Sequence, residues 1–476
     1  MSLLRLTVAS LMLATAVTTG SASADEAGSG CVTTGRELRY LVVFDRGTSR
    51  ADAEAQIAAA CGVPGGYYPQ IAVGIAGSPD PGFGRRIGLD RAFSAQAERL
   101  ATHRLNGSDA PKSAGARPRL SPVAPDAVPV ADRTAEQWDM RSINASWPAS
   151  VSPGSRDVVV GVLDSGVDPA HPDLAAAVEP KLSAGCLTGT PDTAEAAWAP
   201  TTSAHGTHVA GTIAAANDGR GVTGVAPGVR LASIKVIDDR GQVDPEAAVC
   251  GLMWAAAQHI EVANSSFTVG PSSLSCAPGD EHRVVHEAMA RAVEYATAAG
   301  TLTVAAATNE AVNLTPSPRA GVRTPPRSKS CEASPAGLRD VVTVSAIGAD
   351  EVKSGYSSYG LGVIDVTAPG GDTGGCVLST VPGGYEPLCG TSMAAPHVAG
   401  VAALLASAHP GYGPRQLRRA IEQQARPMAC PTDYDLTGDG HQDAYCAGYT
   451  GYNGFYGHGM VNALNALSPV RPGGRS

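Results

Sequence analysis

The sequence lacks the features that mark membrane proteins and nucleic-acid-binding proteins. After the N-terminus, no segment is apolar over the roughly 18 residues needed to cross a bilayer. The 35 basic residues are scattered and are outnumbered by 44 acidic residues, so no segment offers the basic surface that a nucleic acid would need. No fixed-period repeat is visible. We therefore expect a soluble monomer with no nucleic-acid partner and no membrane anchor.

The first 24 residues have the pattern of a secretory signal. A basic residue, Arg5, precedes the apolar run 6–17, and Ala22-Ser23-Ala24 supplies the small residues of a cleavage site. The alternative, a membrane anchor, would need a longer apolar run. We therefore expect residues 1–24 to be removed and the product to be secreted into the extracellular space.

Ten cysteines suit an oxidising compartment. Two precede the large C-terminal region, and eight lie within it, so both sets are even. The many possible pairings leave the connectivity open, although short separations favour Cys376 with Cys389 and Cys430 with Cys446. We expect Cys389 to be half of a disulfide and not a nucleophile.

The chain divides into a small unit, a linker and a large α/β region. Residues 38–44 are typical of a strand, and residues 49–61 of a helix that a serine caps, which together indicate a small α+β unit. Pro, Ala, Ser and Arg dominate residues 106–132, as in an exposed linker.

From residue 157 onward, short β-branched runs alternate with longer helical patterns. This alternation predicts an α/β fold, a mostly parallel sheet with helices on both faces, whose ligands gather at the carboxyl ends of the strands. The expected strands are residues 157–164, 230–237, 261–266, 301–307 and 341–348. The expected helices are residues 205–217, 244–259, 281–299, 392–408 and 414–425.

Three segments supply side chains that a serine needs to cleave a peptide bond. Such a reaction requires a hydroxyl, a base to take its proton, a carboxylate to orient the base, and donors for the developing oxyanion. Asp164 ends an expected strand, His205 begins a helix in His205-Gly-Thr-His-Val-Ala-Gly, and Ser392 begins another in Gly390-Thr-Ser-Met-Ala. Taken singly, Asp164 would be a turn cap and Ser392 a helix cap. His208 lacks the spacing of a metalloprotease ligand, so we expect it to be a packed helix residue.

Together these segments resemble the subtilisin-like serine proteases, whose catalytic residues follow the chain order Asp, His, Ser. The resemblance spans about residues 134–467, and residues 40–96 more weakly resemble the inhibitory pro-domain of that family. It implies that residues 25–133 are a pro-region, that residues 134–468 are the peptidase domain, and that residues 469–476 are a polar tail. The cleavage between the pro-region and the peptidase domain is expected within residues 132–137.

The resemblance also assigns roles to single residues. Asp164 would orient His205, and His205 would take the proton of Ser392, which would form an acyl-enzyme with a polypeptide substrate. The side-chain amide of Asn309 would be the oxyanion donor, together with the N–H of Ser392. No cofactor is needed for this chemistry, and the pro-domain would act as an intramolecular inhibitor.

The sequence departs from the family near the expected substrate site. Thr308 stands where the family usually has glycine, and Thr268 and Phe267 replace a frequent glycine and leucine. We expect Thr308 to narrow the primary specificity pocket and to disfavour bulky aromatic residues at the cleavage position.

Several acidic segments carry further expectations. The segment 238–246 has four acidic groups, which would either attract basic substrate residues or form a solvated loop. A structural calcium ion is an open expectation, with Asp173 and Asp218 at the places where the family has ligands. The loop 435–443 also places oxygen ligands at alternate positions, but Cys446 stands where a calcium loop has glutamate, so a turn-rich disulfide loop is the alternative.

Two other functions compete with an active endopeptidase. The first is a catalytically inactive member of the same fold that binds peptides or serves as a scaffold, which would normally have lost a triad residue. The second is an acid-active protease in which glutamate replaces the histidine base, and His205 argues against it.

Overall fold

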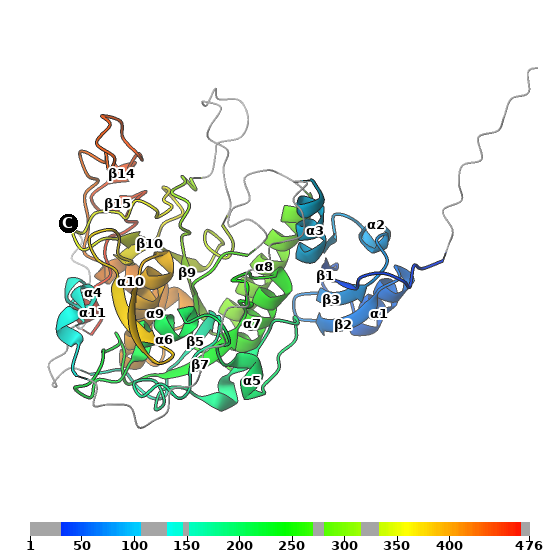
Figure 1. The fold of residues 1–476 in the computed structure, drawn as a ribbon, viewed down its shortest axis with the longest axis horizontal. Helices are drawn as coiled ribbons and strands as arrows, with labels where there is room; N and C mark the ends of the chain where they lie inside the picture. Colours follow the sequence, from blue (N-terminus) through cyan, green and yellow to red (C-terminus); the bar gives the residue numbers. More distant parts are fainter. Residues whose placement is uncertain (1–29, 106–130, 146–151, 270–279, 316–332, 468–476) are drawn as a thin grey trace, which may run out of the picture.

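The computed structural model describes residues 30–105, 131–145, 152–269, 280–315 and 333–467 (Figure 1). The expected signal, most of the expected linker and the whole polar tail lie outside these residues, as do Cys276 and Cys331.

An antiparallel sheet and three helices form the N-terminal unit, residues 30–105. Its strands are β1 (Leu38–Val43), β2 (Val63–Tyr68), β3 (Val73–Ser78) and β4 (Ala92–Phe93), in the order β2-β3-β1-β4. Its helices are α1 (Arg50–Ala59), α2 (Phe83–Ile87) and α3 (Ala95–Leu105). The Ser49 hydroxyl accepts a hydrogen bond from the N–H of Asp52 at 3.1 Å and so caps α1. The expected strand and capped helix are confirmed.

A seven-stranded sheet, parallel at every strand pair, forms the centre of the large domain. Its order is β11-β10-β9-β8-β5-β7-β6. The strands are β5 (Val159–Asp164), β6 (Ala184–Gly185), β7 (Arg230–Lys235), β8 (Val262–Ser265), β9 (Leu302–Ala306), β10 (Val341–Ile347) and β11 (Val366–Pro369). All five expected strands are present, whereas the two-residue β6 and the edge strand β11 were not predicted.

Helices cover both faces of this sheet, as expected. The larger helices are α6 (His205–Ala214), α7 (Pro245–Ala257), α8 (Asp280–Ala298), α9 (Thr391–Ala408) and α10 (Pro414–Gln424). Alternate strand residues point to opposite faces: Val160 and Val162 pack with α6, α9 and α10, whereas Leu163 and Ile234 pack with α7 and α8. Burial on both faces explains why the strands read as continuous apolar runs.

Short elements complete the large domain. They are η1 (Thr134–Glu136), α4 (Trp138–Ser142), η2 (Pro180–Leu182), α5 (Glu195–Trp198), β14 (Gly448–Tyr449), β15 (Tyr452–Asn453) and α11 (Ala463–Ala466). A hairpin of β12 (Val377–Val381) and β13 (Gly384–Leu388) directly precedes α9.

The N-terminal unit packs against α7 and α8, and the blue unit lies beside these green helices in Figure 1. Leu41 and Val43 of β1 share one apolar cluster with residues of both helices. Arg291 of α8 donates hydrogen bonds to the carbonyl oxygens of Phe44 (2.8 Å) and Ile71 (3.0 Å). The two parts therefore meet through an apolar core with hydrogen bonds around it.

Four disulfides join described cysteines: Cys31–Cys61, Cys186–Cys250, Cys376–Cys389 and Cys430–Cys446. The two pairings expected from short separations are confirmed. Within the described residues, one helix, α9, is long and apolar enough to pass for a membrane span, but 83% of it is buried inside the protein. We therefore interpret α9 as the core helix of the large domain.

Candidate active site

Asp164 and His205 form a hydrogen-bonded pair at the carboxyl end of the central strand β5. The Asp164 side chain is fully buried, and His205 Nδ1 lies 2.8 Å from its Oδ1 and 3.0 Å from its Oδ2. The N–H of Ser165 also donates to Oδ1 at 2.7 Å. Gly206 permits this approach, because a Cβ there would lie 2.5 Å from the carbonyl oxygen of Gly166.

The protonation of His205 reflects two opposing effects. Burial disfavours the charged ring, but the negative charge of Asp164 and its hydrogen bond outweigh burial, so the pKa of His205 is raised above its usual range. The His205 side chain keeps 29% of its surface exposed, so the ring can reach a bound substrate. Nδ1 faces the carboxylate, which leaves Nε2 for proton transfer.

His208, one turn along α6, has a different environment. It is fully buried, and its Nε2 lies 3.0 Å from the carbonyl oxygen of Val377 and 3.1 Å from that of Glu386. Burial is the largest cause that lowers the pKa of His208 to about 3, so the ring is neutral and donates from Nε2. The expectation that His208 is a packed helix residue is confirmed.

Ser392 lies in the first turn of α9, beside the end of β8. Its hydroxyl donates to the carbonyl oxygen of Ser266 at 3.2 Å, and the Ser266 hydroxyl donates to the carbonyl oxygen of Ser392 at 2.9 Å. Asn264 supports this pair by donating from Nδ2 to the Ser266 hydroxyl. Catalytic hydrogen bonds are often long or poorly aligned before substrate binds. Here the Ser392 hydroxyl must leave the Ser266 carbonyl oxygen before it can donate to His205. Sequence reasoning did not assign this role to Ser266.

Asn309 follows β9 and points its amide toward the start of α9. Its Oδ1 accepts the N–H of Thr391 at 2.9 Å and the Thr391 hydroxyl at 2.8 Å, which leaves Nδ2 as a donor. A Cβ built on Gly390 would lie 3.3 Å from Asn309 Nδ2 and 3.7 Å from the backbone nitrogen of Ser392. The two expected oxyanion donors therefore border one space, which Gly390 leaves empty.

Thr308 holds the backbone just before Asn309 in an unusual conformation. Its φ is +85°, in the left-handed region that a β-branched residue rarely adopts. Its side chain is buried, its hydroxyl lies 2.7 Å from the Ser358 hydroxyl, and its carbonyl oxygen accepts the N–H of Ser358 at 3.0 Å. Ser358 was not singled out in the sequence, because nothing local connects it to Thr308.

Phe267 and Thr268 lie just beyond β8, after Ser266, and are not part of the strand. Phe267 is buried within the apolar cluster shared with α7 and α8. A buried ring in that cluster is a packing residue, so Phe267 belongs to the core between the sheet and these two helices.

The acidic segment 238–246 partly faces the N-terminal unit, which neither expectation included. Asp244 accepts two hydrogen bonds from Arg99, at 2.7 and 3.2 Å. Glu246 is buried and lies 3.5 Å from Arg39, and burial raises the pKa of Glu246 to about 7. Two acidic groups thus meet arginines of the N-terminal unit.

The carboxylates expected to bind calcium already receive hydrogen bonds. Asp173 accepts the N–H of Val222 at 3.2 Å and the Tyr385 hydroxyl at 3.0 Å, while Asp218 pairs with Arg220 at 2.7 Å. Burial raises the pKa of Asp173 despite these donors. These donors occupy some of the lone pairs of each carboxylate and leave others open, so a structural calcium ion stays a prediction.

The loop 435–443 also satisfies its own carboxylate. Asp435 accepts backbone hydrogen bonds from Gly440 and Gly438, both at 2.7 Å, and these lower its pKa. The described residues contain no group of three or more His, Cys, Asp or Glu side chains that could hold a metal ion. The backbone hydrogen bonds to Asp435 stabilise the turn of the loop that the disulfide Cys430–Cys446 closes.

Known sequences identify the family to which the large domain is similar. The model of the Subtilase family matches residues 155–459, a span that contains Asp164, His205, Asn309 and Ser392. Subtilisin amylosacchariticus from Bacillus subtilis subsp. amylosacchariticus is 35% identical over 274 residues, which are 56% of this chain and 60% of that relative. M-protease from Shouchella clausii is 32% identical over 333 residues, which are 69% of this chain and 74% of that relative.

Solved structures show the same fold. A lanthipeptide protease is 26% identical, with a TM-score of 0.55 over 72% of this chain and 99% of that chain. The epidermin leader peptide processing serine protease from Staphylococcus aureus is 17% identical, with a TM-score of 0.59 over 93% of this chain, and supports the fold alone. The family match over most of the large domain leads to one conclusion: the chain belongs to the subtilase family of peptidases.

Proposed function

We propose that the chain is a serine endopeptidase that hydrolyses polypeptides through an acyl-enzyme intermediate. One observation carries the proposal: the buried Asp164 holds His205 at 2.8 Å, in a helix that packs against α9, whose first turn contains Ser392. His205 Nε2 takes the proton of the Ser392 hydroxyl, whose oxygen attacks the scissile carbonyl. The oxyanion then lies between Asn309 Nδ2 and the N–H of Ser392. Protonated His205 gives its proton to the leaving amine. It then takes a proton from water, whose oxygen attacks the acyl-enzyme, and returns that proton to the Ser392 oxygen as the acyl group leaves.

The alternative of an inactive, peptide-binding member is less well supported. Such a protein would need neither a buried carboxylate behind His205 nor an open space between two oxyanion donors, and the chain keeps both. An acid-active mechanism is also disfavoured, because the raised pKa of His205 keeps this base protonated in acid.

We further propose that the protein is secreted and made as a self-processed precursor. The N-terminal unit would inhibit the enzyme until it is cut off. Two observations support this proposal: the apolar contact of the unit with α7 and α8, and the ion pair Arg99–Asp244. The expected cut within residues 132–137 lies in a docked segment: the N–H of Arg133 donates to the carbonyl oxygen of Gly221 at 2.7 Å. Cleavage there requires this segment to reach Ser392 before it docks. N-terminal sequencing of the secreted product tests the site.

The proposed chemistry takes its nucleophile, base and hydrogen-bond donors from the chain itself, without a cofactor. A structural calcium ion at Asp173 would share the carboxylate with the donors from Tyr385 and Val222. A fall in Tm on chelation would therefore be needed to establish calcium binding.

We propose a preference against bulky aromatic residues at the cleavage position, because Thr308 adds a side chain where the family usually has none. A peptide library profiled with the purified enzyme tests this preference. Efficient cutting after Phe or Tyr would contradict it.

The proposed function is tested with the full-length chain and its Ser392→Ala variant. We expect the wild type to hydrolyse a denatured protein substrate and to be labelled by a serine-directed fluorophosphonate. Ser392→Ala should lose hydrolysis, labelling and processing of the precursor. His205→Ala should also lose hydrolysis, whereas His441→Ala, in the exposed loop 435–443, is the matched control and should keep it. A wild-type chain without hydrolysis or labelling would favour the inactive alternative.

A further inference from the structure

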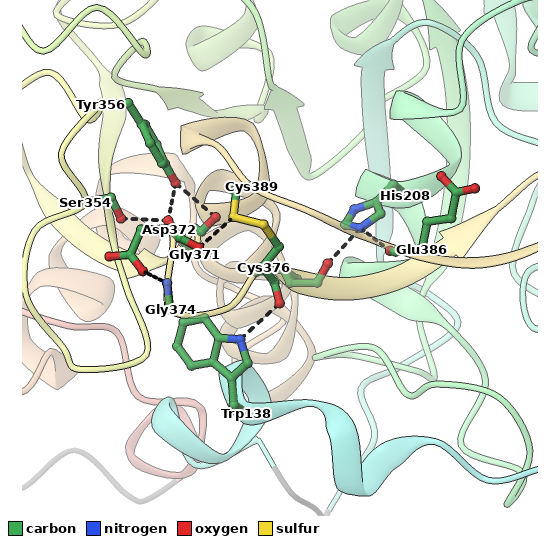
Figure 2. Close-up of a disulfide and its surroundings, with 12 residues drawn as sticks. Trp138, His208, Ser354, Tyr356, Gly371, Asp372, Gly374, Cys376, Glu386 and Cys389 are labelled. Atoms are coloured by element: carbon green, nitrogen blue, oxygen red, sulfur yellow. Dashed lines mark hydrogen bonds between the residues drawn. A yellow bond between two sulfur atoms is a disulfide. The ribbon is translucent and has the colours of Figure 1, made fainter.

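The disulfide Cys376–Cys389 closes the β12–β13 hairpin immediately before the nucleophile. Residues of the hairpin pair in register from Val377 with Leu388 to Val381 with Gly384, so the disulfide adds one more rung to this ladder. Its Cα atoms are 4.8 Å apart, and its second cysteine is three residues before Ser392. Figure 2 shows the disulfide between the loop that contains Gly371 and Asp372 and the hairpin strands.

The hairpin also holds the helix that carries the catalytic base. His208 of α6 donates from Nε2 to carbonyl oxygens in both strands, those of Val377 and Glu386 (Figure 2). In return, the Ser379 hydroxyl donates to the carbonyl oxygen of His208 at 2.8 Å, and the Thr380 hydroxyl to that of Thr207 at 2.8 Å. One short hairpin is therefore bonded to α6 three residues from His205 and continues directly into α9.

The segment between the disulfide and Ser392 has a fixed contact at each residue. Cys389 is held by its sulfur bond, the N–H of Gly390 donates to the carbonyl oxygen of Gly370 at 2.9 Å, and Thr391 donates to Asn309. The other half-cystine is held as well, because Trp138 Nε1 donates to the Cys376 carbonyl oxygen at 3.1 Å (Figure 2).

We propose that the disulfide Cys376–Cys389 is a positioning element that fixes Ser392 relative to His205. Its two cysteines are positioning residues, since they touch neither the reacting atoms nor a substrate. Without the bond, the hairpin opens at the end nearest to Ser392. The segment that leads from Cys389 to Ser392 then loses the first of its fixed contacts. The inference rests on the proposed serine endopeptidase function and identifies the bond that keeps the nucleophile of that site in position.

The chain offers a matched control, the disulfide Cys430–Cys446. The two bonds close loops of similar length, with sequence separations of 13 and 16, so their removal should destabilise the fold to a similar degree. All four cysteines are partly exposed. The experiment compares Cys376→Ser/Cys389→Ser with Cys430→Ser/Cys446→Ser in the full-length chain, by Tm and by kcat and KM on one peptide.

We expect both double variants to lower Tm alike, but only Cys376→Ser/Cys389→Ser to lower kcat, by about tenfold or more, with KM within about twofold. Equal kcat values in the two variants would overturn the proposal. If the first variant does not fold or mature, Trp138→Phe decides, because it removes the hydrogen bond to the Cys376 carbonyl and keeps an aromatic ring against the core. Its kcat should fall a few-fold at nearly unchanged KM, and an unchanged kcat would overturn the proposal. A wild-type chain that is itself inactive would refute the proposed function and this inference with it.

Discussion

Gly390→Ala is the substitution that most directly tests where the oxyanion binds. Gly390 separates the two expected donors, Asn309 Nδ2 and the N–H of Ser392. Its backbone, at φ +154° and ψ 162°, lies in a region that is almost exclusive to glycine. The methyl group of alanine would project into the space that those two donors border.

The size of the effect follows from the distances. The added Cβ would lie 3.3 Å from Asn309 Nδ2 and 3.7 Å from the nitrogen of Ser392. An oxyanion must sit about 2.7–3.1 Å from its donors, so the methyl group and the oxygen would overlap. We expect kcat to fall on the order of 10²- to 10³-fold, as when one oxyanion donor is lost. The unfavourable backbone conformation should also cost about 1–3 kcal/mol of the free energy of unfolding.

The assay must separate the blocked space from the backbone strain. Gly300→Ala is the control, because Gly300 has φ +106° and an added Cβ there would have no atom within 4 Å. Both variants should lower Tm, and only Gly390→Ala should lose turnover of a chromogenic peptide. If Gly390→Ala kept the kcat of Gly300→Ala, the two donors would not border the oxyanion, and the assignment of Asn309 would be wrong.

Three further predictions concern the base, the specificity pocket and the N-terminal unit. Burial lowers the pKa of His205, but the charge of Asp164 and its hydrogen bond outweigh burial and raise it overall. Because His205 acts as a base only when its ring is neutral, kcat/KM should reach half its maximum above about pH 6.5. A midpoint below that pH would contradict the reasoning. Thr308→Gly should raise kcat/KM for peptides with Phe or Tyr at the cleavage position about tenfold relative to Ala peptides, and an unchanged ratio would count against a narrowed pocket. Arg99→Ala should hasten the appearance of activity from the precursor roughly tenfold, but Arg46→Ala only about twofold, because the ion pair of Arg99 is largely buried and that of Arg46 is mostly exposed. Equal effects in this last assay would mean that neither pair determines release.

The sequence was most informative where the chemistry is contiguous. Asp164, His205 and Ser392 each stand in a local pattern that also fixes a strand end or a helix start, so their positions at one edge of the sheet could be predicted. The sheet itself could be predicted because strands buried on both faces leave a plain signal, runs of β-branched residues between helical patterns.

Long-range contacts between short or polar segments could not be predicted. Glu246 lies in a segment whose composition indicates solvent exposure, yet it is buried because the N-terminal unit brings Arg39 to it. The β12–β13 hairpin pairs a short buried strand with a short, partly exposed one. Its place depends on contacts with His208, 169 residues away from Val377. Such pairings are properties of the assembled fold, not of any window of the sequence.

The strained backbone at Thr308 combines a local sequence feature with a long-range contact. A β-branched residue at φ +85° costs on the order of 1–3 kcal/mol, and such conformations persist only where the surroundings enforce them. Two hydrogen bonds to Ser358 enforce this one, and they hold the residue directly before Asn309. Asn309 is in turn fixed from its other side by Thr391, which follows Gly390, a second residue in a conformation that ordinary residues avoid. The unfavourable backbone conformations of Thr308 and Gly390, on either side of the Asn309 side chain, are not required to form the sheet, because both residues lie beyond its strands. It is required if Asn309 Nδ2 must keep one direction, and that requirement is the strongest structural reason to place the oxyanion there.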